Sequence, residues 1–247
     1  MPTMLNLLQD PEEDVRIAAI HAAVALRALR PVLILEELLK FDKLIHIEWR
    51  NLVAKLQDLD WQTHRSAWDK IPQLARSISL ATNRQVPDFE TPIMAALQDP
   101  SPDVPLCALT TLAKLAEIAG FRAVVLHLIP CVIACFSDNR NEIRLQSLRA
   151  ALCLAEYDDF HPRIYQGVQK IISTSKDRDG KVRSTSLKLL LKLAEGFTGK
   201  IPEKIKQTAP HLLTLLQHQS TRRNAVALLT CLAEDQEGSF LSSCLSG

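Results

Sequence analysis

Hydrophobic and polar residues alternate along most of the chain with the period of amphipathic helices, about 3.6 residues. The clearest example is the stretch SDNRNEIRLQSLRAALCLAE at residues 137–156, where polar turn residues lead into an apolar helical pattern that ends in Leu-Ala-Glu. The same triplet ends comparable stretches at residues 115–117, 193–195 and 232–234, and the interval from one triplet to the next is constant. The pattern predicts that one helical module repeats along the chain.

A second marker lies early in each module, where an aliphatic residue precedes an arginine. The marker and its variants occur at Val104-Pro105, Ile143-Arg144, Val182-Arg183 and Thr221-Arg222. Six residues before the arginine position, three modules carry an acid, at Asp99, Asp138 and Asp177. A repeat of roughly forty residues indicates helical hairpins stacked in an array.

This pattern resembles the HEAT repeat family, whose units are two antiparallel helices with an Asp in the turn and a Val-Arg pair at the start of the second helix. The chain begins in the same way, because Asp10-Pro11 leads through Val15-Arg16 into an Ala-rich helix. The second module is less regular, with His64 and Arg65 at the marker positions. The resemblance implies an all-α fold, a single α-solenoid of about six HEAT-like helical hairpins over residues 1–247 that is irregular at repeats 1 and 2. The expected repeats cover residues 1–30, 31–80, 90–119, 121–156, 160–196 and 201–235, with a C-terminal tail at 236–247.

The helical spacing also predicts individual elements. Two helical patterns follow one another over residues 31–59, where a normal repeat has room for one, so we expect an insertion of about ten residues there. Single helices are expected at 121–136, bent at Pro130, at 161–173, and at 202–217, bent at Pro210. Asp138 or Asn139 is expected to cap the helix that runs to Glu156.

Composition agrees with a helical chain, since 47% of the residues are hydrophobic, 5% are aromatic and only 7 are glycine. The 29 Lys and Arg residues nearly balance the 28 Asp and Glu residues, so the net charge of +1 provides no general attraction to nucleic acid or membrane. The N-terminus lacks the basic segment of a signal peptide, and the six cysteines form no spaced framework. These features predict a soluble, cytoplasmic protein.

Catalysis and cofactors have no support in the sequence. The seven histidines are scattered outside any catalytic motif, and no Gly-rich phosphate loop is present. His127, Cys131 and Cys135 have a helical spacing that could hold zinc, but Pro130 disturbs that face, and small cysteines are common in helical cores. We therefore predict a non-enzymatic protein without metal or cofactor.

The recurring acids and arginines have a structural interpretation. Stacking places each arginine near an acid of its own or the adjacent unit, so charge-assisted hydrogen bonds would fix the register of the repeats. The residues of this predicted ladder are Asp10, Arg16, Asp99, Asp138, Arg144, Asp177 and Arg183.

Two surfaces are candidates for a protein partner. On the second helices, the outward positions carry a basic stripe beside acidic residues, and the charges either bind a partner or only solvate the face. The stripe consists of Lys70, Lys114, Arg149, Lys188 and Lys192. The other surface is the edge formed by the turns within repeats, where charge changes from acidic to basic along the array.

The turn edge resembles that of tubulin-binding TOG domains, which are HEAT arrays with a Trp in the first turn and Lys or Arg in later turns. The comparable residues here are Trp61, Arg140, Lys176, Lys181, Arg222 and Arg223. The chain departs from that pattern because its tryptophan lies in the second repeat and its third turn is acidic. A TOG-like surface needs Trp61 exposed, whereas the alternative interpretation buries it against the insertion.

We therefore predict a non-enzymatic scaffold or adaptor for a protein partner. The alternatives are a TOG-like domain that binds tubulin, and a nuclear-transport or chromosome-associated HEAT subunit. No nucleic-acid or membrane partner is predicted, and the chain could belong to a larger array or assembly.

Overall fold

The computed structural model describes residues 6–29, 35–56, 60–80, 88–197 and 200–245, with the side chains of 24–29, 35–43, 61, 80 and 236–245 outside the description. Its longer helices are α2 (Glu13–Leu29), α3 (Leu35–Lys55), α4 (Trp61–Leu80), α6 (Asp103–Ala116), α7 (Arg122–Cys135), α8 (Asn141–Leu154), α11 (Gly180–Glu195) and α14 (Gln219–Leu245). The shorter ones are α5 (Glu90–Leu97), η1 (Ala119–Phe121), η2 (Asp158–Phe160), α9 (His161–Tyr165), α10 (Val168–Thr174), α12 (Glu203–Lys206) and α13 (Ala209–Leu215). The described residues contain no strand, so the predicted all-α class is confirmed.

The chain divides into two compact units. Unit 1 comprises residues 1–99 and 110–125, and unit 2 comprises residues 100–109 and 126–247. Helices α6 and α7 therefore each contribute residues to both units. A single solenoid over residues 1–247 stays a prediction.

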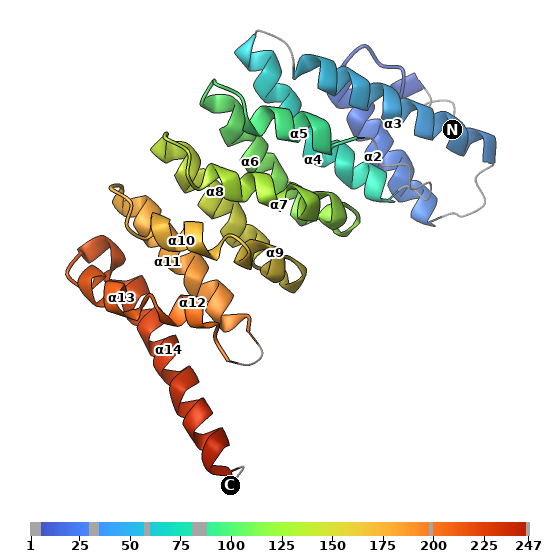
Figure 1. The fold of residues 1–247 in the computed structure, drawn as a ribbon. Helices are drawn as coiled ribbons and strands as arrows, with labels where there is room; N and C mark the ends of the chain where they lie inside the picture. The colour runs from blue at the N-terminus through green and yellow to red at the C-terminus, as the bar shows by residue number, and fades with distance from the viewer. Residues whose placement is uncertain (1–5, 30–34, 57–59, 81–87, 198–199, 246–247) are drawn as a thin grey trace. The chain divides into compact units, whose positions relative to one another are not determined.

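Unit 1 is built on α4, against which both α2 and α3 pack (Figure 1). The aromatic residues fill its interior: Trp68 is buried, and Trp49 stacks on Phe89 with ring centroids 3.9 Å apart. Phe89 in turn meets the edge of Phe121 at 4.8 Å. Trp49 and Trp68 thus occupy the core, where large aromatic side chains contribute most to stability.

The two helical patterns of residues 31–59 do not form two separate helices. The described residues of this region form one helix, α3, which pairs with α4 as the first helix of a hairpin (Figure 1). The segment Phe41-Asp42-Lys43 that joins the two apolar patterns contains neither proline nor glycine, so nothing interrupts the backbone hydrogen bonds. The extra length of this repeat therefore lengthens one helix.

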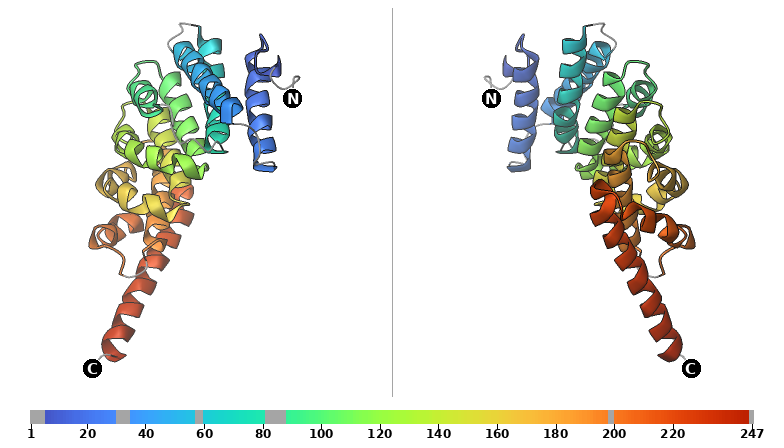
Figure 2. Two further views of the ribbon diagram at one scale, coloured as in Figure 1. Left: turned by 90° about the vertical axis from the view of Figure 1, so that its right-hand side faces the viewer. Right: turned by 90° about the vertical axis from the view of Figure 1, so that its left-hand side faces the viewer.

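Unit 2 consists of two layers of helices. Helix α11 lies between α8 and α14 and packs against both, while α10 and α13 cover α11 and α14 from the other layer (Figures 1 and 2). The facing positions are aliphatic and fully buried, as at Leu148, Leu187, Leu190 and Leu228. This arrangement is the stacked hairpin that the constant repeat period predicts.

The first helices of two hairpins are broken, where the sequence predicts single helices. The helix expected at 161–173 consists of α9 and α10, separated at Gln166-Gly167. A Cβ atom on Gly167 would lie 2.8 Å from Ile133 Cγ2, so the close approach of the two segments requires glycine. The helix expected at 202–217 divides into α12 and α13, and Pro210 lies in the first turn of α13. By contrast, α7 continues through Pro130.

None of the single described helices is long and apolar enough to cross a membrane, although α6 and the segment Ala119–Cys135, bent at their junction, together have the length and composition of one span.

Candidate functional site

Three of the marker arginines hold their guanidinium groups in one pose. In each, Nη1 donates to the carbonyl oxygens six and five residues earlier in the chain. Arg144 reaches Asp138 O at 2.8 Å and Asn139 O at 3.0 Å, and Arg183 reaches Asp177 O at 2.8 Å and Arg178 O at 2.9 Å. Arg16 makes the same pair of bonds, at 2.8 and 3.0 Å. The turn before each second helix is thus fastened to that helix.

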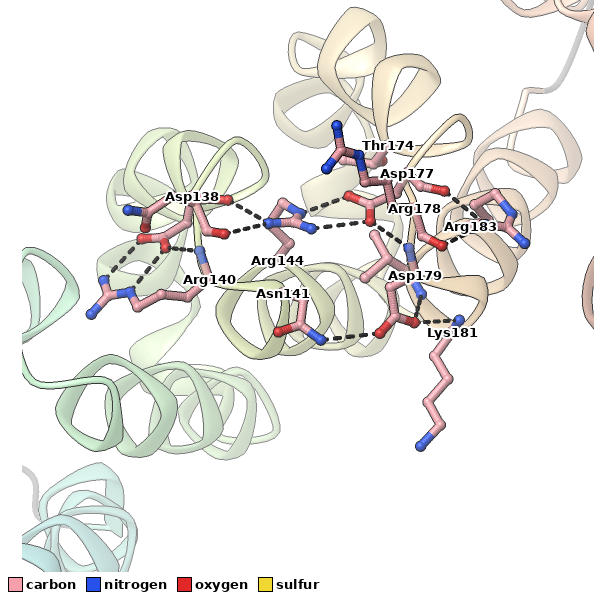
Figure 3. Close-up of polar contacts among 12 residues, drawn as sticks. Asp138, Arg140, Asn141, Arg144, Thr174, Asp177, Arg178, Asp179, Lys181 and Arg183 are labelled. Atoms are coloured by element: carbon pink, nitrogen blue, oxygen red, sulfur yellow. Dashed lines mark hydrogen bonds and ion pairs between the residues drawn. The ribbon is translucent and has the colours of Figure 1, made fainter.

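We call the other two donor nitrogens of the guanidinium, Nε and Nη2, the fork. In two of these repeats the fork donates to both oxygens of one carboxylate. Arg144 donates to both oxygens of Asp177 in the next hairpin, at 2.7 and 3.0 Å (Figure 3). Arg16 donates to both oxygens of Glu48 on α3, at 2.6 and 3.1 Å. Such bidentate pairs fix position as well as adding energy, so they set the register between neighbouring hairpins.

The electrostatics of the Arg144–Asp177 pair favour both charged forms. Burial alone would raise the pKa of Asp177, but hydrogen bonds from the Arg144 guanidinium and the Asp179 amide outweigh it and lower that pKa below its ordinary value. The hydrogen bond to Asp177 in turn raises the pKa of Arg144. Asp177 is therefore ionised and fully engaged within unit 2.

Arg183 departs from the predicted ladder. The position equivalent to Asp177 in the next hairpin, one repeat period further along the chain, is Leu216. Within the described part of the chain, Arg183 Nε is buried without a hydrogen-bond acceptor, and Nη2 makes no hydrogen bond. Figure 3 shows Arg183 on the side of Asp177 opposite Arg144, with its fork directed away from that carboxylate. The substitution of leucine for the acid was visible in the sequence and is the signal that the sequence analysis missed.

Asp138 meets a different arginine from the one that the ladder predicts. The marker position of the preceding repeat is Pro105, which cannot form an ion pair with Asp138. Arg140 takes that role: its Nε and Nη2 each lie 2.9 Å from an oxygen of Asp138, and its Nη1 donates to Pro100 O at 2.9 Å. These hydrogen bonds lower the pKa of Asp138. Arg140, predicted to face a partner, is therefore engaged within unit 2, and it also replaces the expected Asp138 or Asn139 at the N-cap of α8.

Two other acids of the predicted ladder are Asp10, which accepts a hydrogen bond from the Glu12 amide at 2.9 Å, and Asp99, which lies half-buried in the turn after α5. Asp179, which was not part of the predicted ladder, caps α11 by accepting from the Lys181 amide at 2.7 Å. The hydrogen bond from Asn141, followed by those from the α11 amides, lowers the pKa of Asp179.

The turns of the last two hairpins carry exposed cations. We call this surface the basic turn edge, and it consists of Lys176, Arg178, Lys181, Arg222 and Arg223. The two turns adjoin, because a Cβ atom on Gly180 would lie 3.1 Å from Ser220 Oγ. The same Cβ atom would lie 3.6 Å from Arg183 Nη2, so this donor is close to the point where the turns adjoin. Arg178 was not among the predicted residues, although it lies in the same charged turn. Trp61 begins α4, and its side chain lies outside the description, so the exposure that a TOG-like surface needs and the alternative burial both stay predictions.

The basic stripe on the second helices is partly neutralised by neighbouring helices. In unit 1, Lys70 lies 2.6 Å from Glu13 and 3.0 Å from Asp14, and Lys114 lies 3.8 Å from Asp69. In unit 2, Lys192 lies 3.0 Å from Glu156. Exposed Arg149 and Lys188, at equivalent positions of α8 and α11, are the other members of the stripe.

The described residues contain no group of three side chains placed to hold a metal ion. His127 is exposed and Cys135 is buried, so the two side chains lie in different environments. Burial, followed by the charge of Asp138, raises the pKa of Cys135 to about 11, which keeps its thiol protonated.

Comparisons with known proteins agree with the fold. The family profile described as HEAT repeat matches residues 1–26. Among solved structures, an engineered protein matches at 15% identity over 94% of this chain and 96% of its own, with a TM-score of 0.59. A designed armadillo repeat protein in complex with the peptide (KR)4 matches at 17% identity over 94% and 98%, with a TM-score of 0.57. Computationally designed armadillo repeat proteins for modular peptide recognition match at 17% identity over 93% and 98%, with a TM-score of 0.56. No curated protein sequence matches this chain.

Proposed function

We propose that this chain, a HEAT-repeat α-solenoid, is a non-enzymatic protein-interaction scaffold whose basic turn edge binds an acidic segment of a partner protein. The observation that carries the proposal is the charge imbalance of two adjoining turns. Their five cations are exposed, while the acids of the same turns, Asp177 and Asp179, already serve Arg144 and the first amides of α11. The edge therefore presents positive charge that its own acids do not neutralise.

The second-helix face supports a partner less well. Lys70, Lys114 and Lys192 are each paired with an acid of a neighbouring hairpin, so a partner would have to compete with existing ion pairs. Exposed rim charges chiefly govern association rate and specificity, and both depend on charge that is available to the partner.

Solved structures of similar fold are described as peptide binders, which supports a peptide-like segment as the bound element. The peptide (KR)4 in one of them is basic, whereas the turn edge here has the opposite requirement. Tubulin is one candidate for an acidic partner within this proposal, and a nuclear-transport or chromosome-associated role would use the edge in the same way.

The test uses a fluorescein-labelled octaglutamate peptide with an amidated C-terminus, titrated with the protein at low salt and followed by fluorescence anisotropy. Lys176→Glu with Lys181→Glu reverses two exposed charges of the edge. Lys200→Glu with Lys204→Glu is the matched control, because it changes the net charge equally but lies between the end of α11 and the start of α12, whereas the basic turn edge lies at the start of α11. We expect the first pair to raise the Kd about tenfold or more and the control pair to raise it about twofold.

Equal losses for the two pairs would show that only net charge matters and would contradict the proposal. Absence of binding by the wild-type chain would also contradict it. An oligonucleotide that displaces octaglutamate at equal charge concentration, with a steep salt dependence, would instead indicate a nucleic-acid surface.

A further inference from the structure

We propose that Arg183 is a carboxylate-binding residue, whose Nε and Nη2 grip an acidic group of the partner in the way that Arg144 grips Asp177. This inference rests on the proposed function and names the residue that would recognise the partner. The bound group is a carboxylate, from either an Asp or Glu side chain or a chain terminus.

The chain itself provides the template. Arg16, Arg144 and Arg183 fix Nη1 on the same two carbonyl positions, at distances from 2.8 to 3.0 Å. In the first two, the fork then meets both oxygens of one carboxylate. Arg183 has the same anchoring and the same fork, so its guanidinium is already oriented for a bidentate partner. Such orientation lowers the entropy cost of binding.

No acid of the described chain reaches this fork. The ladder would place one at position 216, where leucine stands. Arg183 Nε is consequently buried and unpaired, which is unfavourable for a charged donor and rare in folded proteins. A carboxylate supplied by another molecule would satisfy both donors at once when the atoms that cover Nε move aside.

The surroundings suit an incoming anion. Arg183 is partly exposed, and its Nη2 lies beside the point where the turns of the last two hairpins adjoin. The basic turn edge surrounds that point, and both acids of the turn are engaged elsewhere: Asp177 binds Arg144 on its other side (Figure 3), and Asp179 accepts from the first amides of α11. Positive potential would therefore guide a carboxylate towards the fork.

The first test follows the Arg183 Nε–H signal by ¹H–¹⁵N NMR, assigned with Arg183→Lys, while sodium acetate replaces sodium chloride at constant ionic strength. We expect acetate to move the Arg183 signal saturably and to leave the Arg144 signal in place, since that fork is occupied. If acetate moves neither signal, or moves both equally, the inference is overturned.

Leu216→Asp provides a second test, because it places an acid where the repeat pattern would have one. We expect it to occupy the fork, raise the thermal midpoint by about 2–4 °C, and abolish the acetate response. Gln217→Asp adds the same charge at the neighbouring exposed position, and Leu216→Asn removes the leucine without adding charge. Both should retain the response; a Leu216→Asp variant that responds like wild type would contradict the inference.

Peptide binding separates this inference from the proposed function. Arg183→Lys keeps the charge but loses the fork, and we expect it to weaken octaglutamate about tenfold, whereas Arg223→Lys should change the Kd less than about twofold. A neutral peptide with a free C-terminus, compared with its amidated form, shows whether a chain terminus also binds. If octaglutamate binds but Arg183→Lys changes its Kd no more than Arg223→Lys does, the partner does not use the fork, and only the proposal for the basic turn edge is supported. If acetate occupies the fork but octaglutamate does not bind, the proposed function fails.

Discussion

Asp177→Ala should destabilise unit 2, because this carboxylate joins two hairpins. Asp177 accepts three hydrogen bonds, from Arg144 Nε at 2.7 Å, Arg144 Nη2 at 3.0 Å and the Asp179 amide at 2.9 Å. The side chains of the pair are only 17% and 9% exposed. Truncation would leave the Arg144 fork partly buried without an acceptor.

The expected cost follows from the burial. Breaking a buried ion pair costs about 3–5 kcal/mol, and an exposed pair contributes at most about 1 kcal/mol. Because this pair is mostly but not completely buried, we expect about 2–3 kcal/mol, which lowers the thermal midpoint by roughly 4–12 °C for a chain of this size. Thermal unfolding followed by circular dichroism measures the shift.

Asp158→Ala is the matched control, since Asp158 is exposed at the start of η2 and its removal should cost less than about 0.5 kcal/mol. Arg144→Ala and the double variant complete a mutant cycle, in which we expect a coupling energy of about 1 kcal/mol or more. A midpoint for Asp177→Ala equal to that of Asp158→Ala, or additive effects in the cycle, would refute the role of the pair in joining the hairpins.

Two further predictions concern the stability of unit 2. The folded pKa of Asp177 lies below its ordinary value of 3.8. The contribution of Asp177 to the free energy of unfolding is therefore complete above that pH and is lost as the pH falls through the folded pKa. In a series of denaturation measurements at decreasing pH, the difference in stability between wild type and Asp177→Asn should stay constant above about pH 4 and narrow below it. A gap that narrows near neutral pH would contradict this assignment. Gly196→Ala should lower the thermal midpoint by roughly 2–12 °C, since a Cβ there would overlap the His161 ring. The additional change His161→Ala should recover part of this loss, because it removes the overlap but also the hydrogen bond between His161 Nε2 and Ala155 O. Gly180→Ala, with 3.1 Å to the rotatable Ser220 hydroxyl, should shift the midpoint by less than about 2 °C. An unchanged midpoint for Gly196→Ala would show that His161 is free to move.

The repeat period predicted the hairpins because the same apolar spacing and the same Asp and Arg positions return at a constant interval along the chain. It did not predict where helices break, since the break at Gly167 depends on contact with Ile133, which lies on α7 in the preceding hairpin. Likewise, the apolar spacing of residues 31–59 does not distinguish two helices from the single α3.

The candidate site was predictable only in part. Spacing placed the cations of the turns, but the acceptor of each cation depends on the neighbouring repeat. Arg140 is engaged because Pro105 leaves Asp138 without its ladder arginine, and Lys192 is engaged because Glu156 lies beside it, just after α8. Within the described residues, Arg183 Nε has no acceptor for the opposite reason, because Leu216 replaces the expected acid.

Backbone hydrogen exchange in the presence and absence of octaglutamate tests the central claim most directly, because it locates the binding surface in the intact chain. The account predicts that the peptide slows exchange in segments covering residues 175–183 and 217–224, and that Lys176→Glu with Lys181→Glu removes this protection. Protection confined to α8 and α11 around Arg149 and Lys188, with the turns unaffected, would contradict it.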